Sequence, residues 1–146
     1  AAGLAALPPN TQYVSVHDGA RPLISLEQIA ETYQTAKLHQ SAASARPVTE
    51  TIKRANENGI VTEPVDRENL WFMETPQIFK SDLLLKAYTE VQNQGERVTD
   101  EVSAMELIGQ TTHLVSNSSP NPKITYPQDI ELAEKLLGIG SCKNLT

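Results

Sequence analysis

The residue types best suited to chemistry lie together in the run Val14 to Leu23, which reads VSVHDGARPL. An apolar segment typical of a buried strand ends there in Asp18, Gly19 and Arg21. Open α/β sheets bind ligands beyond the carboxyl ends of their strands, and a glycine lets the backbone approach a ligand closely. We expect the Asp18 carboxylate to bind a metal ion or a hydroxyl group, and the Arg21 guanidinium to bind phosphate. The alternative is an internal Asp18–Arg21 ion pair that closes the turn.

Lys123 is a second candidate for anion binding. It follows a polar loop at residues 117–122 and precedes the short segment Ile124-Thr125 and a capped helix. In that place it is expected to project over a phosphate at the same edge of the sheet. On the local pattern alone, a solvated lysine remains the alternative.

A projecting β-hairpin is predicted at about residues 48–70. Two strand-like segments, 48–54 and 60–65, flank Asn58-Gly59, and an Asn-Gly pair is a strong signal for a hairpin turn. A charged arm that only protects an edge from aggregation is the alternative to a binding role. Its polar and charged residues include Thr51, Lys53, Arg54, Asp66 and Arg67.

Histidine and cysteine do not suggest a metal centre. His17, His39 and His113 are far apart and lack metal-ligand spacing, so we expect them to pack or to lie at the surface. Cys142 is the single cysteine, which excludes an internal disulfide and fits a reducing compartment.

The elements that must position these residues alternate between helix and strand, which predicts an α/β fold. Strands are expected at Val14–Val16, Leu70–Met73 and His113–Val115, with a strand remnant at Lys123–Thr125. Capping residues predict four helices, which begin near Ser25 (with Gln28), Ser81, Thr99-Asp100 and Thr125 (with Gln128). Their inward faces are expected to be Leu26, Ile29, Tyr33 and Ala36; Leu84, Leu85, Tyr88 and Val91; Val102, Met105 and Leu107; and Ile130, Ala133, Leu136 and Leu137.

Length and charge narrow the function classes. A chain of 146 residues fits one domain, and its net charge of −6 argues against nucleic-acid binding through general charge. No apolar run approaches the ~18 residues of a membrane span, and no signal peptide is recognisable. We therefore expect a cytoplasmic protein that binds neither nucleic acid nor membrane.

Six blocks follow one another along the chain: VHDGARPL, TETIKR, VDRENLW, ETPQIF, VTDEVS and PKITYPQDIELAEKLL. In this order they resemble the 2-C-methyl-D-erythritol 4-phosphate cytidylyltransferases of the non-mevalonate isoprenoid pathway, and the resemblance runs from about Gly3 to Gly138. The resemblance implies a Rossmann-like nucleotidyltransferase sheet, here partial, with an inserted hairpin that forms a homodimer. It implies transfer of CMP from CTP to methylerythritol phosphate, with release of pyrophosphate and with a divalent metal, usually Mg²⁺. A plastid is then an alternative to the cytoplasm.

The resemblance also implies roles for single residues. Lys123 and Arg67 would be catalytic, because they position or neutralise the reacting phosphates. Asp18 would line the substrate and metal site. Pro122 departs from the branched apolar residue that usually precedes the lysine, and it removes a backbone donor there. Substrate contacts would come from Asp18, Arg21, Thr51, Thr75 and Thr99, with Thr51 and Arg67 reaching the neighbouring subunit's site.

We expect residues 1–140 to be the C-terminal portion of one cytidylyltransferase domain and 141–146 to be a tail. The family's glycine-rich loop, which cradles the CTP triphosphate, has no counterpart in the sequence. We therefore expect the chain alone to be inactive.

Two other readings remain open at this stage, and a third is rejected. A sister enzyme acting on ribitol 5-phosphate shares the HDxxRP block, and a non-catalytic dimerisation module would need only the hairpin. A receiver-type signalling domain fits poorly, because no acidic pair precedes Asp18 and the Asn-Gly hairpin has no place in it.

Overall fold

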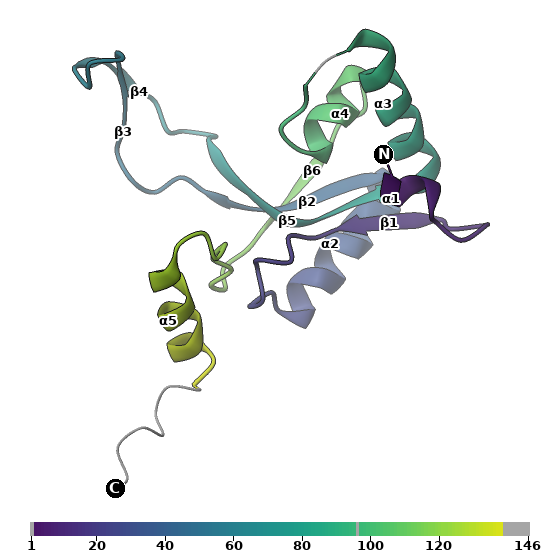
Figure 1. Cartoon of the computed structure of the whole chain (residues 1–146), viewed down its shortest axis with the longest axis horizontal. Coiled ribbons are helices and arrows are strands. Elements are labelled where there is room, and N and C mark those ends of the chain that lie inside the picture. The colour runs from purple at the N-terminus through teal and green to yellow at the C-terminus, as the bar shows by residue number, and fades with distance from the viewer. Residues whose placement is uncertain (1, 96, 139–146) are drawn as a thin grey trace, which may run out of the picture.

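The computed structural model describes residues 2–95 and 97–138. Four strands form the main sheet in the order β1-β5-β2-β6, and Figure 1 shows helices on both of its faces. The strands are β1 (Tyr13–Val16), β2 (Ser41–Pro47), β5 (Trp71–Lys80) and β6 (His113–Ser116). β5 runs antiparallel to β1 and β2, and β2 runs parallel to β6. The carboxyl ends of β1, β2 and β6 therefore meet along one edge.

Two small cores hold the layers together. On one face, Phe79 of β5 packs with Leu84 and Ala87 of α3 (Ser81–Gln94) and with Met105 of α4 (Glu101–Leu107). On the other face, Ile78 packs with Ala42 of β2 and Ala36 of α2 (Leu26–His39). Neighbouring residues of a strand point to opposite faces, so Ile78 and Phe79 serve different cores.

The buried face of α2 differs from the predicted one. Only Ala36 of the expected residues is buried, whereas Leu26 is 80% exposed and Ile29 and Tyr33 are about 40% exposed. The helix turns Gln28 and Thr32 inward instead, because Gln28 Nε2 donates to Ser44 Oγ and to the Val115 carbonyl. Ser25 caps the helix by accepting from the Gln28 amide, but the Gln28 side chain does not complete the predicted capping box.

The ends of α3 and α4 agree with the sequence only in part. Gly95 ends α3 with a left-handed φ of 66°, and Asp100 caps α4 by accepting from the Ser103 amide. The prediction that Ser81 caps α3 is wrong, because its hydroxyl donates to the carbonyls of the chain before β1. Leu85 was expected inward and is 55% exposed.

A two-stranded hairpin projects from the main sheet (Figure 1). It consists of β3 (Ile52–Ala55) and β4 (Val61–Val65), which pair antiparallel. Asn56 Oδ1 accepts from the amides of Asn58 and Ile60, and Gly59 adopts a φ of 76°. The turn lies at the Asn-Gly pair that the sequence singled out.

The last helix, α5 (Pro127–Leu136), lies apart from the rest of the molecule in Figure 1. Tyr126 precedes its first turn rather than Thr125, and the Asp129 carboxylate accepts from the amides of both. The predicted Thr125–Gln128 capping pair is therefore wrong, and Lys123–Thr125 forms no strand. Of its expected inward residues only Ala133 is buried, while Ile130, Leu136 and Leu137 are about half exposed.

The short helix α1 (Ala2–Ala5) precedes β1. The expected tail at 141–146 lies outside the described residues. Within the described ranges, no helix combines the length and the apolar character needed to cross a membrane.

Candidate functional site

The chain leaves β1 in a tight turn that brings Asp18 and Arg21 together. The Arg21 amide donates to the Asp18 carbonyl at 3.0 Å, and Arg21 Nε donates to Asp18 Oδ2 at 3.2 Å. The Arg21 side chain is only 13% exposed, and its Nη1 donates to the Asn121 carbonyl at 2.7 Å. The internal ion pair that was the alternative reading is thus present, and it holds Arg21 at the carboxyl edge of the sheet.

Lys123 reaches the same carboxylate from the loop that follows β6. Its Nζ lies 3.3 Å from Asp18 Oδ2, and the Ile124 amide donates to the Ala20 carbonyl at 2.8 Å. Partial burial raises the pKa of Asp18, but hydrogen bonds and charge from Lys123 and Arg21 outweigh it and hold the pKa below the ordinary value. Lys123 is not simply solvated, and the Asp18 carboxylate orients both Lys123 and Arg21.

His17 and Thr75 brace this turn from behind. Thr75 Oγ1 accepts from the Asp18 amide at 3.0 Å and lies 2.9 Å from His17 Nδ1, while His17 Nε2 lies 3.0 Å from the Arg21 carbonyl. A carbonyl can only accept, so Nε2 donates to the Arg21 carbonyl, while Nδ1 and the Thr75 hydroxyl share the second hydrogen bond. His17 was expected to be a packing or surface residue, but it links Thr75 to the Arg21 carbonyl and so helps to fix the Asp18 turn.

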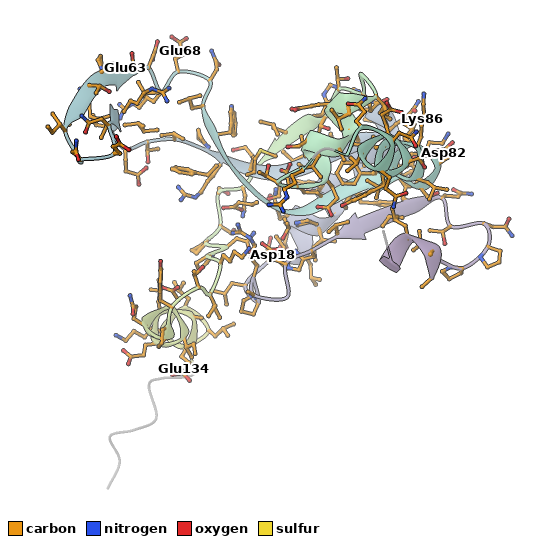
Figure 2. The ribbon with its side chains drawn as sticks, turned by 45° about the horizontal axis from the view of Figure 1, so that its top comes forward. Asp18, Glu63, Glu68, Asp82, Lys86 and Glu134 are labelled. Carbon is orange, nitrogen blue, oxygen red and sulfur yellow. The ribbon has the colours of Figure 1, made fainter. Side chains whose placement is uncertain are left out.

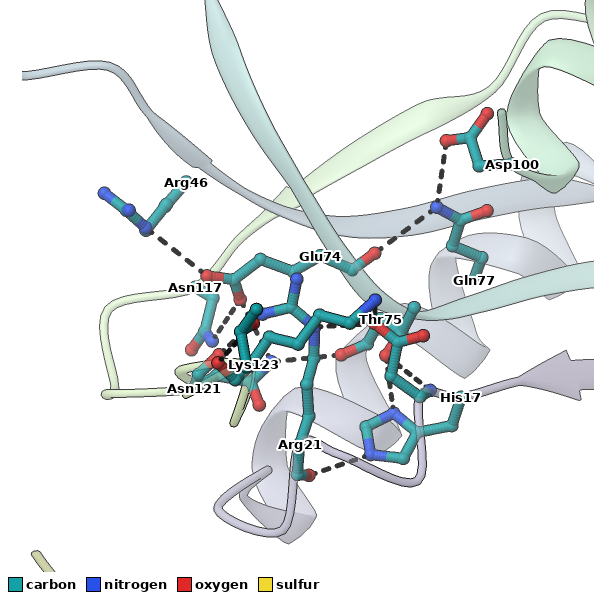
Figure 3. A network of polar contacts seen from close by, with 12 residues as sticks. His17, Arg21, Arg46, Glu74, Thr75, Gln77, Asp100, Asn117, Asn121 and Lys123 are labelled. Carbon is teal, nitrogen blue, oxygen red and sulfur yellow. Dashed lines mark hydrogen bonds and ion pairs between the residues drawn. The ribbon is translucent and has the colours of Figure 1, made fainter. Parts of the chain in front are cut away.

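Behind Lys123 lies a buried polar cluster that sequence reasoning did not identify. Glu74 of β5 is 4% exposed, and its Oε2 accepts from Asn117 Nδ2 at 2.9 Å and from Asn121 Nδ2 at 3.1 Å. Arg46 Nε lies 3.5 Å from Glu74 Oε1, with the guanidinium 4.3 Å above the Phe72 ring. Figure 3 shows this cluster next to Lys123 and Arg21.

These side chains surround an open cleft of about 630 Å³ between the sheet edge and α5. Three cations line it, together with an apolar wall from β5 and α5. Such a mixture of a few convergent charges and apolar surface is typical of a small-molecule site. The lining residues include Arg21, Arg46, Lys123, Phe72, Met73, Leu132 and Leu136.

The structure does not bring all the predicted site residues to this cleft. Thr51 and Arg67 are exposed at the base of the hairpin, where Arg67 Nη1 donates to the Thr49 carbonyl. Figure 2 shows the hairpin residues Glu63 and Glu68 far from Asp18. Thr99 is exposed ahead of α4, and its hydroxyl lies 3.3 Å from Ser103 Oγ.

A metal ion would find few protein ligands here. Among residues 2–95 and 97–138, no three His, Cys, Asp or Glu side chains gather at one point. The Asp18 carboxylate faces Arg21 and Lys123, and both contact its Oδ2. Mg²⁺ is commonly held by one or two carboxylates together with substrate phosphates. The donor set fits such a shared ion and not a metal held by the protein alone.

Comparison with known proteins identifies the family of this chain. A family model described as IspD, 2-C-methyl-D-erythritol 4-phosphate cytidylyltransferase, matches residues 1–138. The chain belongs to this family. The resemblance inferred from the sequence blocks is confirmed, and the ribitol phosphate reading is not favoured.

Individual members of the family show how far the likeness extends. The 2-C-methyl-D-erythritol 4-phosphate cytidylyltransferase of Desulforamulus reducens is 39% identical over 140 residues, which cover 96% of this chain and 60% of the relative. The chloroplastic enzyme of that name from Oryza sativa subsp. japonica is 38% identical over 135 residues, covering 92% and 46%. The crystal structure of the Thermus thermophilus enzyme gives a TM-score of 0.86 at 30% identity, covering 94% and 66%.

Two conclusions follow from these comparisons. The α/β nucleotidyltransferase fold expected from the sequence is confirmed by the solved IspD structure. The chain, however, spans only about half to 60% of the length of these curated relatives.

Proposed function

We propose that this chain takes part in the transfer of CMP from CTP to 2-C-methyl-D-erythritol 4-phosphate, with release of pyrophosphate. The observation that carries the proposal is the pair of cations, Arg21 and Lys123, held by one carboxylate at the mouth of a cleft. The reaction joins two anions, so its catalyst must above all bring cations to the phosphates.

The chemical step is a displacement at phosphorus. An oxygen of the methylerythritol phosphate group bonds to the α-phosphorus of CTP, while the bond from that phosphorus to the bridging oxygen breaks and pyrophosphate leaves with the electron pair. A phosphate monoester is largely dianionic near pH 7, so no protein base is needed to create the nucleophile. The low pKa of Asp18 keeps it ionised, which suits it to orient cations rather than to donate protons.

Arg21 and Lys123 would divide the work according to their exposure. Arg21 is largely buried and fixed by Asp18 and Asn121, so it offers a rigid guanidinium to a phosphate. Lys123 is about half exposed and its ammonium lies beside Asp18, so it can turn from that carboxylate to a phosphate oxygen. Charge stabilisation by such groups is the largest single contribution to many enzymatic rate enhancements.

A divalent metal, usually Mg²⁺, belongs to the same proposal. Asp18 would hold it together with the phosphates of CTP, and when bound it would neutralise phosphate charge. Arg21 and Lys123 would supply the other positive charges that face the phosphates.

The proposal includes a homodimer formed through the hairpin. Thr51 and Arg67 flank β3 and β4, at the base of the arm that projects from the main sheet in Figure 1, and a projecting arm can bring residues to the site of a second subunit. Arg67 would then help to position the attacking phosphate.

Thr99 and Thr75 are proposed as further polar contacts, although the Thr75 hydroxyl is already engaged with Asp18 and His17. A cytoplasmic location is proposed, with a plastid as the alternative because the Oryza relative is named chloroplastic.

Pyrophosphate release from CTP tests the proposal. The assay compares methylerythritol phosphate with ribitol 5-phosphate, using the 146-residue chain and also the chain joined to the part of the D. reducens relative that the match does not cover. We expect release from the joined protein with methylerythritol phosphate only. No release that depends on methylerythritol phosphate, from either protein, would refute the proposal.

A further inference from the structure

Glu74 is the most deeply buried carboxylate that the proposed mechanism does not use. It lies in the middle of β5, directly before Thr75, and is 4% exposed. A buried carboxylate is costly unless its charge is paired and its oxygens accept hydrogen bonds. Glu74 meets both conditions, because two asparagine amides donate to Oε2 and the Arg46 guanidinium lies beside Oε1.

Both asparagines belong to the loop that carries Lys123. The Asn117 amide donates to the Ala45 carbonyl at 2.8 Å at the start of the loop, and Asn121 lies two residues before Lys123. The carbonyl of Asn121 accepts the 2.7 Å hydrogen bond from Arg21. Glu74 therefore holds the loop at two points, and both of them precede Lys123.

The orientation of the Asn121 side chain depends on these acceptors. Its Nδ2 donates to Glu74 Oε2 and to the Thr75 carbonyl at 3.0 Å. Its Oδ1 is buried and has no hydrogen-bond partner among the described residues. Acceptors on β5 therefore hold the amide in place, and Glu74 supplies one of the two.

We infer that Glu74 is a positioning residue, which fixes the 117–123 loop so that Lys123 and the Asn121 carbonyl face Asp18 and Arg21. It contacts neither Arg21 nor Lys123 and acts through Asn117 and Asn121. Its importance for catalysis rests on the proposed function, but its effect on the loop does not.

Hydrogen exchange of the Ile124 amide reports on the loop without any activity assay. This amide donates to the Ala20 carbonyl and joins the end of the loop to the Asp18 turn. In Glu74→Ala of the 146-residue chain, we expect the Ile124 amide to exchange about tenfold faster or more at neutral pH, while the amides of β5 keep their protection. In Glu74→Gln, the amide oxygen can take the place of Oε2 and accept from both asparagines, so exchange should stay close to that of the wild type.

Two further variants keep the experiment decisive. Asn121→Ala removes the hydrogen bonds from Asn121 to Glu74 and to the Thr75 carbonyl but leaves Glu74 paired with Asn117 and Arg46. It should also speed exchange of the Ile124 amide. Asp82→Asn changes an exposed carboxylate on α3, far from Asp18 in Figure 2, and should leave exchange unchanged. Unchanged Ile124 exchange in folded Glu74→Ala, or in Asn121→Ala should Glu74→Ala not fold, overturns the inference.

Kinetics of the joined protein give the catalytic consequence. A small displacement of a catalytic group can cost about 100-fold in rate. We expect Glu74→Ala to lower kcat to that extent, with the KM for CTP changed much less, and Glu74→Gln to recover most of the rate. A joined protein that is inactive without any substitution would refute the proposed function and leave the exchange result standing. An unchanged kcat in Glu74→Ala would refute the positioning role.

Discussion

Replacing Lys123 by methionine separates function from stability at this site. The lysine side chain is 51% exposed, and its ammonium lies 3.3 Å from Asp18 Oδ2. An exposed ion pair of this kind contributes at most about 1 kcal/mol to stability, and the methionine keeps most of the apolar stem. For a chain of this size, such a loss lowers Tm by no more than about 4 °C.

The expected effect on transfer is much larger. Removal of one group that stabilises charge in a transition state costs about 100- to 1000-fold in kcat. The assay is pyrophosphate release by the joined protein with CTP and methylerythritol phosphate, run beside a thermal unfolding scan of the same sample. Lys86→Met is the matched control, because Lys86 lies on α3 far from Asp18 in Figure 2.

Two outcomes would refute this reasoning. A rate within about threefold of the wild type would show that Lys123 does not stabilise the reacting phosphates, since a charge-stabilising group should contribute far more. A fall in Tm of more than about 8 °C would show that the lysine is structural, since an exposed pair cannot account for that loss.

The remaining predictions concern acid stability, the core and the hairpin. The pKa of Asp18 is lowered in the folded protein, so this carboxylate stabilises the fold above its unfolded pKa of about 3.8. That stabilisation is lost as the pH falls through the folded pKa. Urea unfolding should therefore show that acidification lowers the free energy of unfolding less in Asp18→Asn than in the wild type. Met105→Ala should destabilise the fold by about 2–5 kcal/mol because the side chain is fully buried, and an unchanged midpoint in urea would contradict the core described above. Replacing residues 52–65 by a short Gly-Ser linker should convert a dimer into a monomer in light scattering, and a wild type that is already monomeric would contradict the proposed assembly.

Sequence patterns predicted correctly those turns and helix caps that depend only on residues close together in the chain. The turn at Gly59 and the cap at Asp100 need only nearby residues, and the structure has both. The strand that ends in Asp18 and Arg21 was recognised for the same reason, since both the ion pair and the turn lie within three residues.

Features that depend on distant partners were missed. Hydrophobic periodicity placed Ile29 and Tyr33 inward, but α2 buries Gln28, whose partners are 16 and 87 residues away in the sequence. Glu74 was missed in the same way, because its asparagine partners lie 43 and 47 residues downstream. A buried polar group becomes favourable only when the fold supplies its hydrogen bonds, and no local pattern of residue types contains that information.

The long strand β5 connects the hairpin, the candidate site and both cores. One end continues from the hairpin, its middle carries Glu74 and Thr75, and its far end supplies Ile78 and Phe79 to the two cores. β2 pairs with β5 from Trp71 to Phe79, and β1 pairs with its last four residues, from Gln77 to Lys80. A partner bound to the hairpin would therefore contact a segment that continues directly into the strand that carries Glu74 and holds the lysine loop.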